Sequence, residues 1–153
     1  MRSSKGAPEG LLLLDKPTGP TSHDIVIEVR RLLGLKKVGH TGTLDPMASG
    51  LLVILLGRAT KLAPFLSLDP KKYEGSFILG ITTDTLDIEG KVTGGTPYRD
   101  DPARVEAALA SLEGDVEQLP PMYSAVKVAG RELYKHARAG RVVERTARPI
   151  RVD

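Results

Sequence analysis

Two short apolar runs, Leu11–Leu14 and Leu51–Leu56, constrain the fold of this chain more than any other feature. Each run has the length of a buried strand and is far too short to span a bilayer. Between them, apolar residues recur at helical spacing and form one stripe of an amphipathic helix: Ile25, Val26, Val29, Leu32 and Leu33. The sequence therefore predicts two buried strands with a helix between them.

Capping and turn residues mark the ends of this helix. Thr21 or Ser22 is the expected N-terminal cap, after the turn at residues 16–20, and Gly34 is expected to end the helix. Residues 36–49 contain Gly, Thr, Asp and Pro but no apolar period, which predicts a loop.

The rest of the chain alternates between short strand and helix patterns. Strands are predicted over residues 72–79, 123–128 and 148–152, and helices from Asp101-Pro102 to Gly114 and over residues 132–139. This order favours an α+β domain whose mixed, largely antiparallel sheet is flanked by helices.

Composition excludes several classes of function. The chain has 153 residues, enough for one domain with a core, and it has no Cys, which excludes thiolate catalysis, disulfides and Cys-ligated metal. No His cluster or carboxylate pair has ligand spacing, so we expect no metal site. Residues 1–9 have no apolar stretch long enough for a signal peptide, and we expect a flexible lead and a cytoplasmic protein.

Charge is unevenly distributed along the sequence. Residues 127–151 contain eight Lys or Arg and two acids, whereas residues 84–117 contain nine acids and three bases. A basic segment beside an acidic one indicates a face suited to a polyanion, although a solvated basic surface has the same pattern.

The loop Gly39–Gly50, with the sequence GHTGTLDPMASG, is the strongest candidate for chemistry. Its glycines allow tight turns and close approach to a ligand, and Pro46 biases Asp45 towards an extended conformation. A carboxylate on such a loop could be a nucleophile, a general base or a metal ligand. An Asp-Pro turn with a capping carboxylate is the structural alternative.

Four blocks of sequence resemble the TruB-type tRNA pseudouridine synthases in order and spacing. The segment Gly39–Lys61, GHTGTLDPMASGLLVILLGRATK, resembles the active-site motif of that family. Gly10–Asp24, GLLLLDKPTGPTSHD, resembles its first motif, and Asp69–Tyr73, DPKKY, resembles the segment with the active-site tyrosine. Leu119–Gly140, LPPMYSAVKVAGRELYKHARAG, resembles a later motif of the bacterial branch.

The resemblance implies isomerisation of a uridine in the T loop of tRNA to pseudouridine, without a cofactor. It implies that residues 10–153 are the front part of the catalytic domain, without its later catalytic strands and C-terminal RNA-binding domain. The expected partner is the tRNA T arm, with no membrane, and we expect the full-length protein to be a monomer.

The resemblance also implies roles for individual residues. Asp45 matches the catalytic aspartate, Tyr73 the tyrosine that stacks on the extruded base, and His40 the histidine that enters the T loop. An ionised carboxylate in a dry site needs a cationic partner. The family's arginine-bearing motif is absent from these 153 residues, so we expect little or no activity from them alone.

Further residues are expected to support the loop or to contact RNA. Loop support or RNA contact is expected of Lys16, Pro17, Gly39, Thr41 and Gly42. Salt-dependent phosphate contacts are expected of Arg131, Lys135, Arg138 and Arg141. Ser22 is interpreted as a helix cap.

Two other functions remain open at the sequence level. One is an RNA-binding fragment or scaffold of the same fold that is catalytically weak or inactive. The other is a member of the related guide-RNA-dependent branch, although the block Leu119–Gly140 favours the stand-alone bacterial type.

Overall fold

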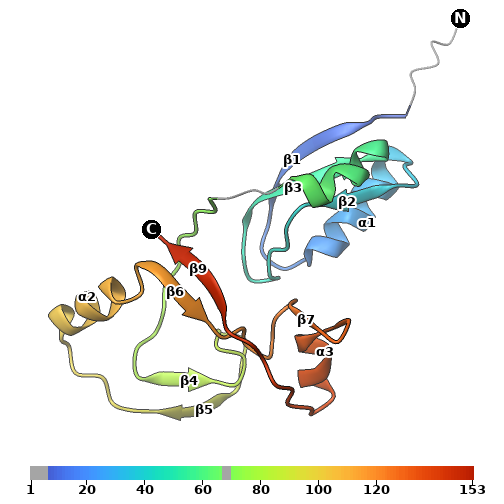
Figure 1. The fold of residues 1–153 in the computed structure, drawn as a ribbon. Coiled ribbons are helices and arrows are strands. Elements are labelled where there is room, and N and C mark those ends of the chain that lie inside the picture. Colours follow the sequence, from blue (N-terminus) through green and yellow to red (C-terminus); the bar gives the residue numbers. More distant parts are fainter. Residues whose placement is uncertain (1–6, 67–69) are drawn as a thin grey trace, which may run out of the picture. The chain divides into compact units, whose positions relative to one another are not determined.

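The computed structural model describes residues 7–66 and 70–153. The chain divides into two compact units, Met1–Glu74 and Gly75–Asp153, and each is described by itself (Figure 1). Asp69, the first residue of the DPKKY block, lies outside the described residues.

A three-stranded antiparallel sheet forms the centre of the first unit. Its order is β1 (Gly10–Lys16), β3 (Gly50–Leu56) and β2 (Val38–His40). Leu12 and His40 both pair with Ile54 from opposite sides. Both predicted buried strands are confirmed. β2 lies within the segment predicted as a loop, because three residues with a single apolar side chain are too short to show a period.

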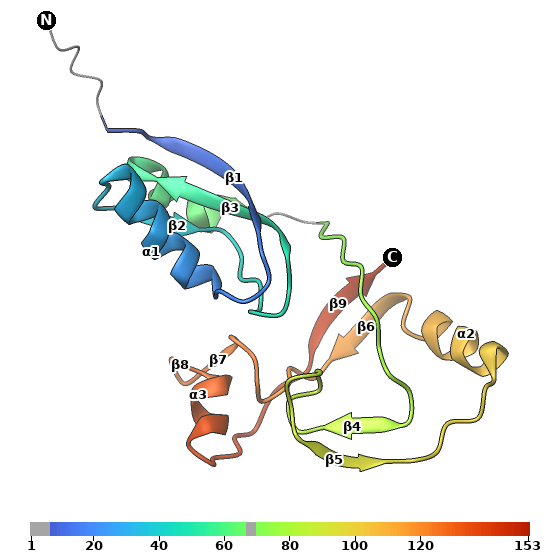
Figure 2. The ribbon, with the colours of Figure 1, turned by 180° about the vertical axis from the view of Figure 1, so that it is seen from behind.

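Helix α1 (Ser22–Leu33) and the 3-10 helix η1 (Gly57–Phe65) lie on opposite faces of this sheet, as the two views in Figures 1 and 2 show. On the α1 face, the helix contributes Ile25, Val26 and Val29 to a buried core with Leu52, Ile54 and Leu56 of β3. Side chains alternate between the faces of a strand. Val53 and Leu55 are therefore buried on the η1 face, where Leu11, Leu13 and Leu51 stay exposed.

The ends of α1 follow the capping rules. Thr21 is the N-cap, and it forms a capping box in which its side chain and Asp24 each accept from the other's main-chain N–H. Gly34 ends the helix at φ 62°, a left-handed conformation in which glycine carries no Cβ penalty. The predicted cap and stop are both confirmed.

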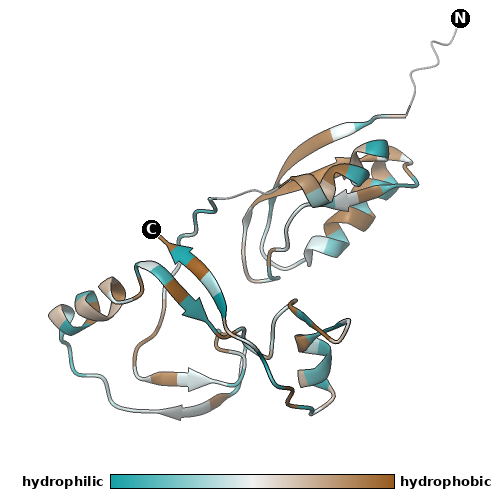
Figure 3. Ribbon diagram, in the orientation of Figure 1, coloured by the Kyte–Doolittle hydropathy of each residue, from teal (hydrophilic) through white to brown (hydrophobic). Residues whose placement is uncertain are grey.

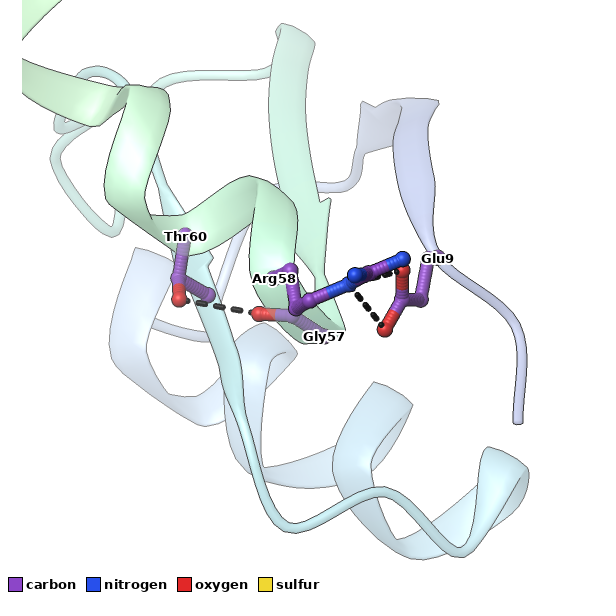
Figure 4. Close-up of polar contacts among 4 residues, drawn as sticks. All are labelled: Glu9, Gly57, Arg58 and Thr60. Carbon is purple, nitrogen blue, oxygen red and sulfur yellow. Dashed lines mark hydrogen bonds and ion pairs between the residues drawn. The ribbon is translucent and has the colours of Figure 1, made fainter. Parts of the chain in front are cut away.

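An ion pair joins the segment before β1 to the start of η1. Arg58 donates through Nε to both carboxylate oxygens of Glu9, at 2.7 and 3.0 Å, while Thr60 bonds to the Gly57 carbonyl at 2.9 Å (Figure 4). Because the Arg58 side chain is 85% exposed, this pair contributes little to stability.

The second unit contains three two-stranded antiparallel ladders and two helices. β4 (Ile81–Thr83) pairs with β5 (Val92–Gly95), β6 (Gly114–Gln118) with β9 (Arg148–Val152), and β7 (Lys127–Val128) with β8 (Arg131–Glu132). The helices are α2 (Pro102–Ala110) and α3 (Leu133–Arg138). Asp101 caps α2 as predicted, by accepting from the main-chain N–H of Arg104 at 3.1 Å.

Of the strands predicted in the second half, one is wrong and another is wrong in extent. Residues 72–79 form no strand, because no partner strand pairs with them within the described part of the chain. Of the strand predicted over 123–128, only Lys127–Val128 forms one. The helix predicted to reach Gly114 ends at Ala110, and Gly114 begins β6 instead.

The α+β class is confirmed, and every strand pairing among the described residues is antiparallel. Figure 3 shows apolar residues along most of β1 and β3, whereas β6 and β9 mix apolar with hydrophilic positions. No helix in residues 7–66 and 70–153 is long and apolar enough to cross a membrane.

Candidate active site

The side chain of Lys16 is fully buried at the end of β1, where the chain meets the loop Gly39–Gly50. Its ammonium donates to the main-chain carbonyls of Ala48 (2.7 Å), Pro17 (3.0 Å) and Asp45 (3.1 Å), with that of Pro46 at 3.4 Å. A buried ammonium without partners is strongly unfavourable, so these carbonyls must converge on it. This geometry favours loop support by Lys16 over a phosphate contact.

The first residue of α1 and the turn before it also bind this loop. The buried Ser22 hydroxyl accepts from the Leu44 N–H and donates to the Leu44 carbonyl, both at 2.9 Å. Gly19, at φ 109°, donates its N–H to the Pro46 carbonyl at 2.8 Å. The interpretation of Ser22 as a helix cap is wrong, because Thr21 caps α1 and leaves the Ser22 hydroxyl free for the loop.

Asp45 combines a fixed main chain with an exposed side chain. Its carbonyl accepts from the Ala48 N–H at 3.0 Å, which closes a tight turn, and also from Lys16. Within residues 7–66 and 70–153, its carboxylate makes no hydrogen bond or ion pair, so it does not cap the turn. A free carboxylate on an anchored backbone suits a nucleophile or a base.

His40 and Thr41 join β2 to the loop. The Thr41 N–H donates to the Val53 carbonyl at 3.2 Å, which extends the ladder to β3 by one residue. His40 Nδ1 and Thr41 Oγ1 are buried and have no partner among the described residues. Nearby, a side chain at Gly42 would meet nothing within 4 Å, so this part of the loop is open. A buried polar atom without a partner is unfavourable, and a functional role is one explanation for both atoms.

Tyr73 is not brought to the loop by any described contact. It is 71% exposed, and in the described part of the chain it makes no hydrogen bond to the loop residues. Pro17 and Gly39, by contrast, lie at the loop, Pro17 through its carbonyl and Gly39 in β2. The structure therefore places in or beside the loop Lys16, Pro17, Gly39, His40, Thr41, Gly42 and Asp45. Among the described residues it shows no hydrogen bond from Tyr73 to them.

Four basic residues of the second unit lie on or beside α3. Lys135 donates to Glu132 at 2.8 Å, and this hydrogen bond lowers the pKa of the Glu132 carboxyl and raises the pKa of the Lys135 ammonium. The Arg138 guanidinium lies 5.4 Å from the centre of the Tyr134 ring. Arg131 and Arg141 are exposed at the two ends of the helix. The four predicted phosphate contacts thus lie on or beside one helix.

No group of three or more His, Cys, Asp or Glu side chains that could hold a metal ion occurs in residues 7–66 and 70–153.

Comparison with known proteins decides the family. The family model described as TruB family pseudouridylate synthase (N terminal domain) matches residues 30–153, most of the chain. The chain belongs to the TruB family. The matched region includes Asp45, His40 and the whole of the basic segment.

Curated relatives carry the same family relationship beyond the matched region. The chain is 54% identical over 147 residues to "tRNA pseudouridine synthase B" of Geobacillus kaustophilus, covering 94% of this chain and 51% of that protein. The protein with the same name from Opitutus terrae is 50% identical, with 95% of this chain and 61% of that protein covered. This TruB-family chain therefore spans about half the length of several curated relatives that it matches.

A solved structure supports the fold. The structure of a Cbf5-Nop10-Gar1 complex is similar with a TM-score of 0.50 and 32% identity, over 77% of this chain and 31% of that chain. The predicted family is thus confirmed.

Ser22 and Gly19 are the loop contacts that the sequence prediction missed, because neither residue type signals a bond to a loop more than twenty positions away.

Proposed function

We propose that this TruB-family chain is part of an enzyme that isomerises a uridine in the T loop of tRNA to pseudouridine, with Asp45 as its nucleophile. The observation that carries the proposal is an exposed Asp45 carboxylate on a main chain bound by Lys16 and Ser22. The names of the relatives support tRNA as the substrate.

The reaction requires only groups that a protein side chain supplies. The bond from ribose C1′ to uracil N1 breaks, a bond from C1′ to C5 forms, N1 gains a proton and C5 loses one. Nothing is oxidised, and no group is imported. Asp45 attacks the substrate and leaves again, and its anchored main chain contributes by holding the carboxylate in one position.

The target base has to leave the RNA stack before this chemistry occurs. We infer that Tyr73 stacks on the extruded uracil and that His40 occupies the space the uridine leaves. The exposure of Tyr73 and the unpaired Nδ1 of His40 support these roles. The basic residues around α3 would contact the phosphates of the T arm.

A second candidate is an RNA-binding scaffold of the same fold with weak or no turnover. The observation in its favour is that no cation pairs with the Asp45 carboxylate in residues 7–66 and 70–153. Both candidates bind the T-arm RNA, but only the enzyme forms pseudouridine.

The test uses the longest natural chain that contains this sequence. It is incubated with a T-arm stem-loop RNA, and the nucleosides are then analysed for pseudouridine. An RNA with cytidine at the target position is the matched control. We expect pseudouridine in the first RNA and none in the second. Tight binding of both RNAs without any pseudouridine would contradict the enzyme and favour the scaffold.

A further inference from the structure

We propose that Ser22 is a positioning residue for Asp45. Ser22 acts on Asp45 through the main chain of Leu44. The inference rests on the proposed function and deepens it, because it assigns part of the rate to a residue that does not touch the substrate.

The Ser22 hydroxyl satisfies both main-chain groups of the residue before Asp45. It accepts from the Leu44 N–H and donates to the Leu44 carbonyl, each at 2.9 Å. Only 2% of Ser22 is exposed. A hydroxyl is one of the few side-chain groups that donates and accepts at the same atom, so it fixes Leu44 from one side of the chain.

Lys16 fixes the other side of Asp45. Its ammonium binds the carbonyl of Asp45 and that of Ala48, while the Gly19 N–H binds the carbonyl of Pro46. The main chain is therefore anchored before and after Asp45, and the exposed carboxylate is the part that remains free. Removal of the Leu44 anchor releases the chain on one side only.

Ser22→Ala removes this anchor and little else. The Leu44 N–H and carbonyl are left without their partner, and the loop relaxes to satisfy them elsewhere. A misplacement of about 1 Å in a reacting group costs on the order of 10²-fold in rate. We therefore expect kcat to fall by roughly 10- to 100-fold. KM and RNA affinity should change little, because the buried Ser22 has no surface to offer to RNA.

The neighbouring residue supplies a matched control. Thr21 also carries a hydroxyl, but it binds Asp24 within α1 and makes no hydrogen bond to the loop among the described residues. Thr21→Ala removes the cap and lowers the melting temperature by a few degrees. It should leave kcat near that of the wild type, so the pair separates reduced helix stability from impaired positioning.

The experiment measures kcat, KM and melting temperature for the wild type, Ser22→Ala and Thr21→Ala in the longest natural chain, with a T-arm stem-loop RNA as substrate. Hydrogen exchange at the Leu44 amide is measured in parallel. We expect Ser22→Ala alone to lower kcat and to speed exchange at Leu44. If Ser22→Ala does not fold, Ser22→Cys, which keeps the volume with a weaker donor and acceptor, takes its place.

Two failures are distinguishable. An active wild type with equal kcat values for the Ser22 and Thr21 variants would overturn the positioning role and leave the proposed function intact. A wild type that binds the RNA but forms no pseudouridine would remove the proposed function, and the positioning role with it.

Discussion

Lys16 is a buried cation whose hydrogen bonds, within the described residues, all go to main-chain carbonyls. Three of the four carbonyls belong to the loop around Asp45, so the charge of one strand residue determines the path of a segment about thirty positions away. A neutral side chain of the same length could not draw these carbonyls together, because their dipoles would repel one another.

We expect Lys16→Met to destabilise the chain by about 2–4 kcal/mol, because methionine fills the space but leaves these partly buried carbonyls without a donor. Urea denaturation followed by circular dichroism measures the change. Lys36→Met is the control at an exposed lysine, and it should change stability by no more than about 0.5 kcal/mol. Equal midpoints for the two variants would show that the carbonyl contacts do not hold the loop.

The resemblance to the TruB family implied roles for Asp45 and Lys16, but nothing in the sequence indicated the contact from Ser22 to the loop. Asp45 and Lys16 each lie in a block that resembles a motif of the family, and the resemblance implies a role for each. Ser22 lies in the same block as Lys16 but carries no such signal, because a serine at the start of a helix is adequately explained as a cap. The difference is physical, since only the packing of α1 against the sheet decides which of the two adjacent hydroxyls faces the loop.

At the scale of elements, helix α1 begins with a charge-dependent cap. The hydrogen bonds from the Thr21 hydroxyl and main-chain N–H hold the pKa of the Asp24 carboxyl below its ordinary value. A carboxyl whose pKa is lower in the folded state stabilises the fold above its unfolded pKa, and this stability is lost as pH falls through the folded pKa.

We therefore expect Asp24→Ala to be less stable than the wild type at pH 7, with a gap that narrows as the pH falls below about 4. Denaturation midpoints measured from pH 7 to pH 2 test this. Glu28→Ala, at an exposed acid of the same helix, should show a smaller dependence on pH. A gap for Asp24→Ala that is constant over this range would mean that the carboxylate charge does not contribute to the cap.

The exposed arginines at the end of α3 and just beyond it are the basis of a prediction about RNA affinity. If the proposed phosphate contacts are made, Arg138→Gln with Arg141→Gln should weaken binding to a T-arm RNA, because each substitution removes one charge that neutralises a phosphate. The slope of log affinity against log salt should fall by roughly one for each phosphate that is no longer neutralised. Arg99→Gln with Arg104→Gln removes the same charge from the acidic segment, residues 84–117, and is the matched control. Equal slopes for the two double variants would place the phosphate contacts elsewhere.

Elements with local signals were predictable, and those that depend on distant pairing were not. The caps at Thr21, Gly34 and Asp101 and the strand at Leu51–Leu56 follow from neighbouring residues. β6 was missed because Gly114–Gln118 is mostly polar, and its pairing with β9 joins residues far apart in the sequence. The prediction for residues 72–79 was wrong for the opposite reason. The sequence has an apolar pattern there, but such a pattern does not form a strand without a partner strand.

At the scale of the whole molecule, the chain has two compact units, and the candidate residues are divided between them. The loop with Asp45 belongs to the first unit, and the basic residues around α3 belong to the second. The α+β class was predictable from the mixed order of strand and helix patterns, and the family from four blocks of sequence that agree in order. The separation into units was not, because residues 72–79, where the division after Glu74 falls, have a pattern that predicts a strand.

We propose that Asp45 performs the chemistry from an anchored loop. The decisive experiment is Asp45→Asn in the longest natural chain, with pseudouridine formation and binding of a T-arm RNA measured on the same preparation. Asparagine keeps the shape and removes the charge. We expect no pseudouridine and an RNA affinity within about 2-fold of the wild type, since the proposed phosphate contacts would supply most of the affinity. Turnover retained by Asp45→Asn would contradict this proposal.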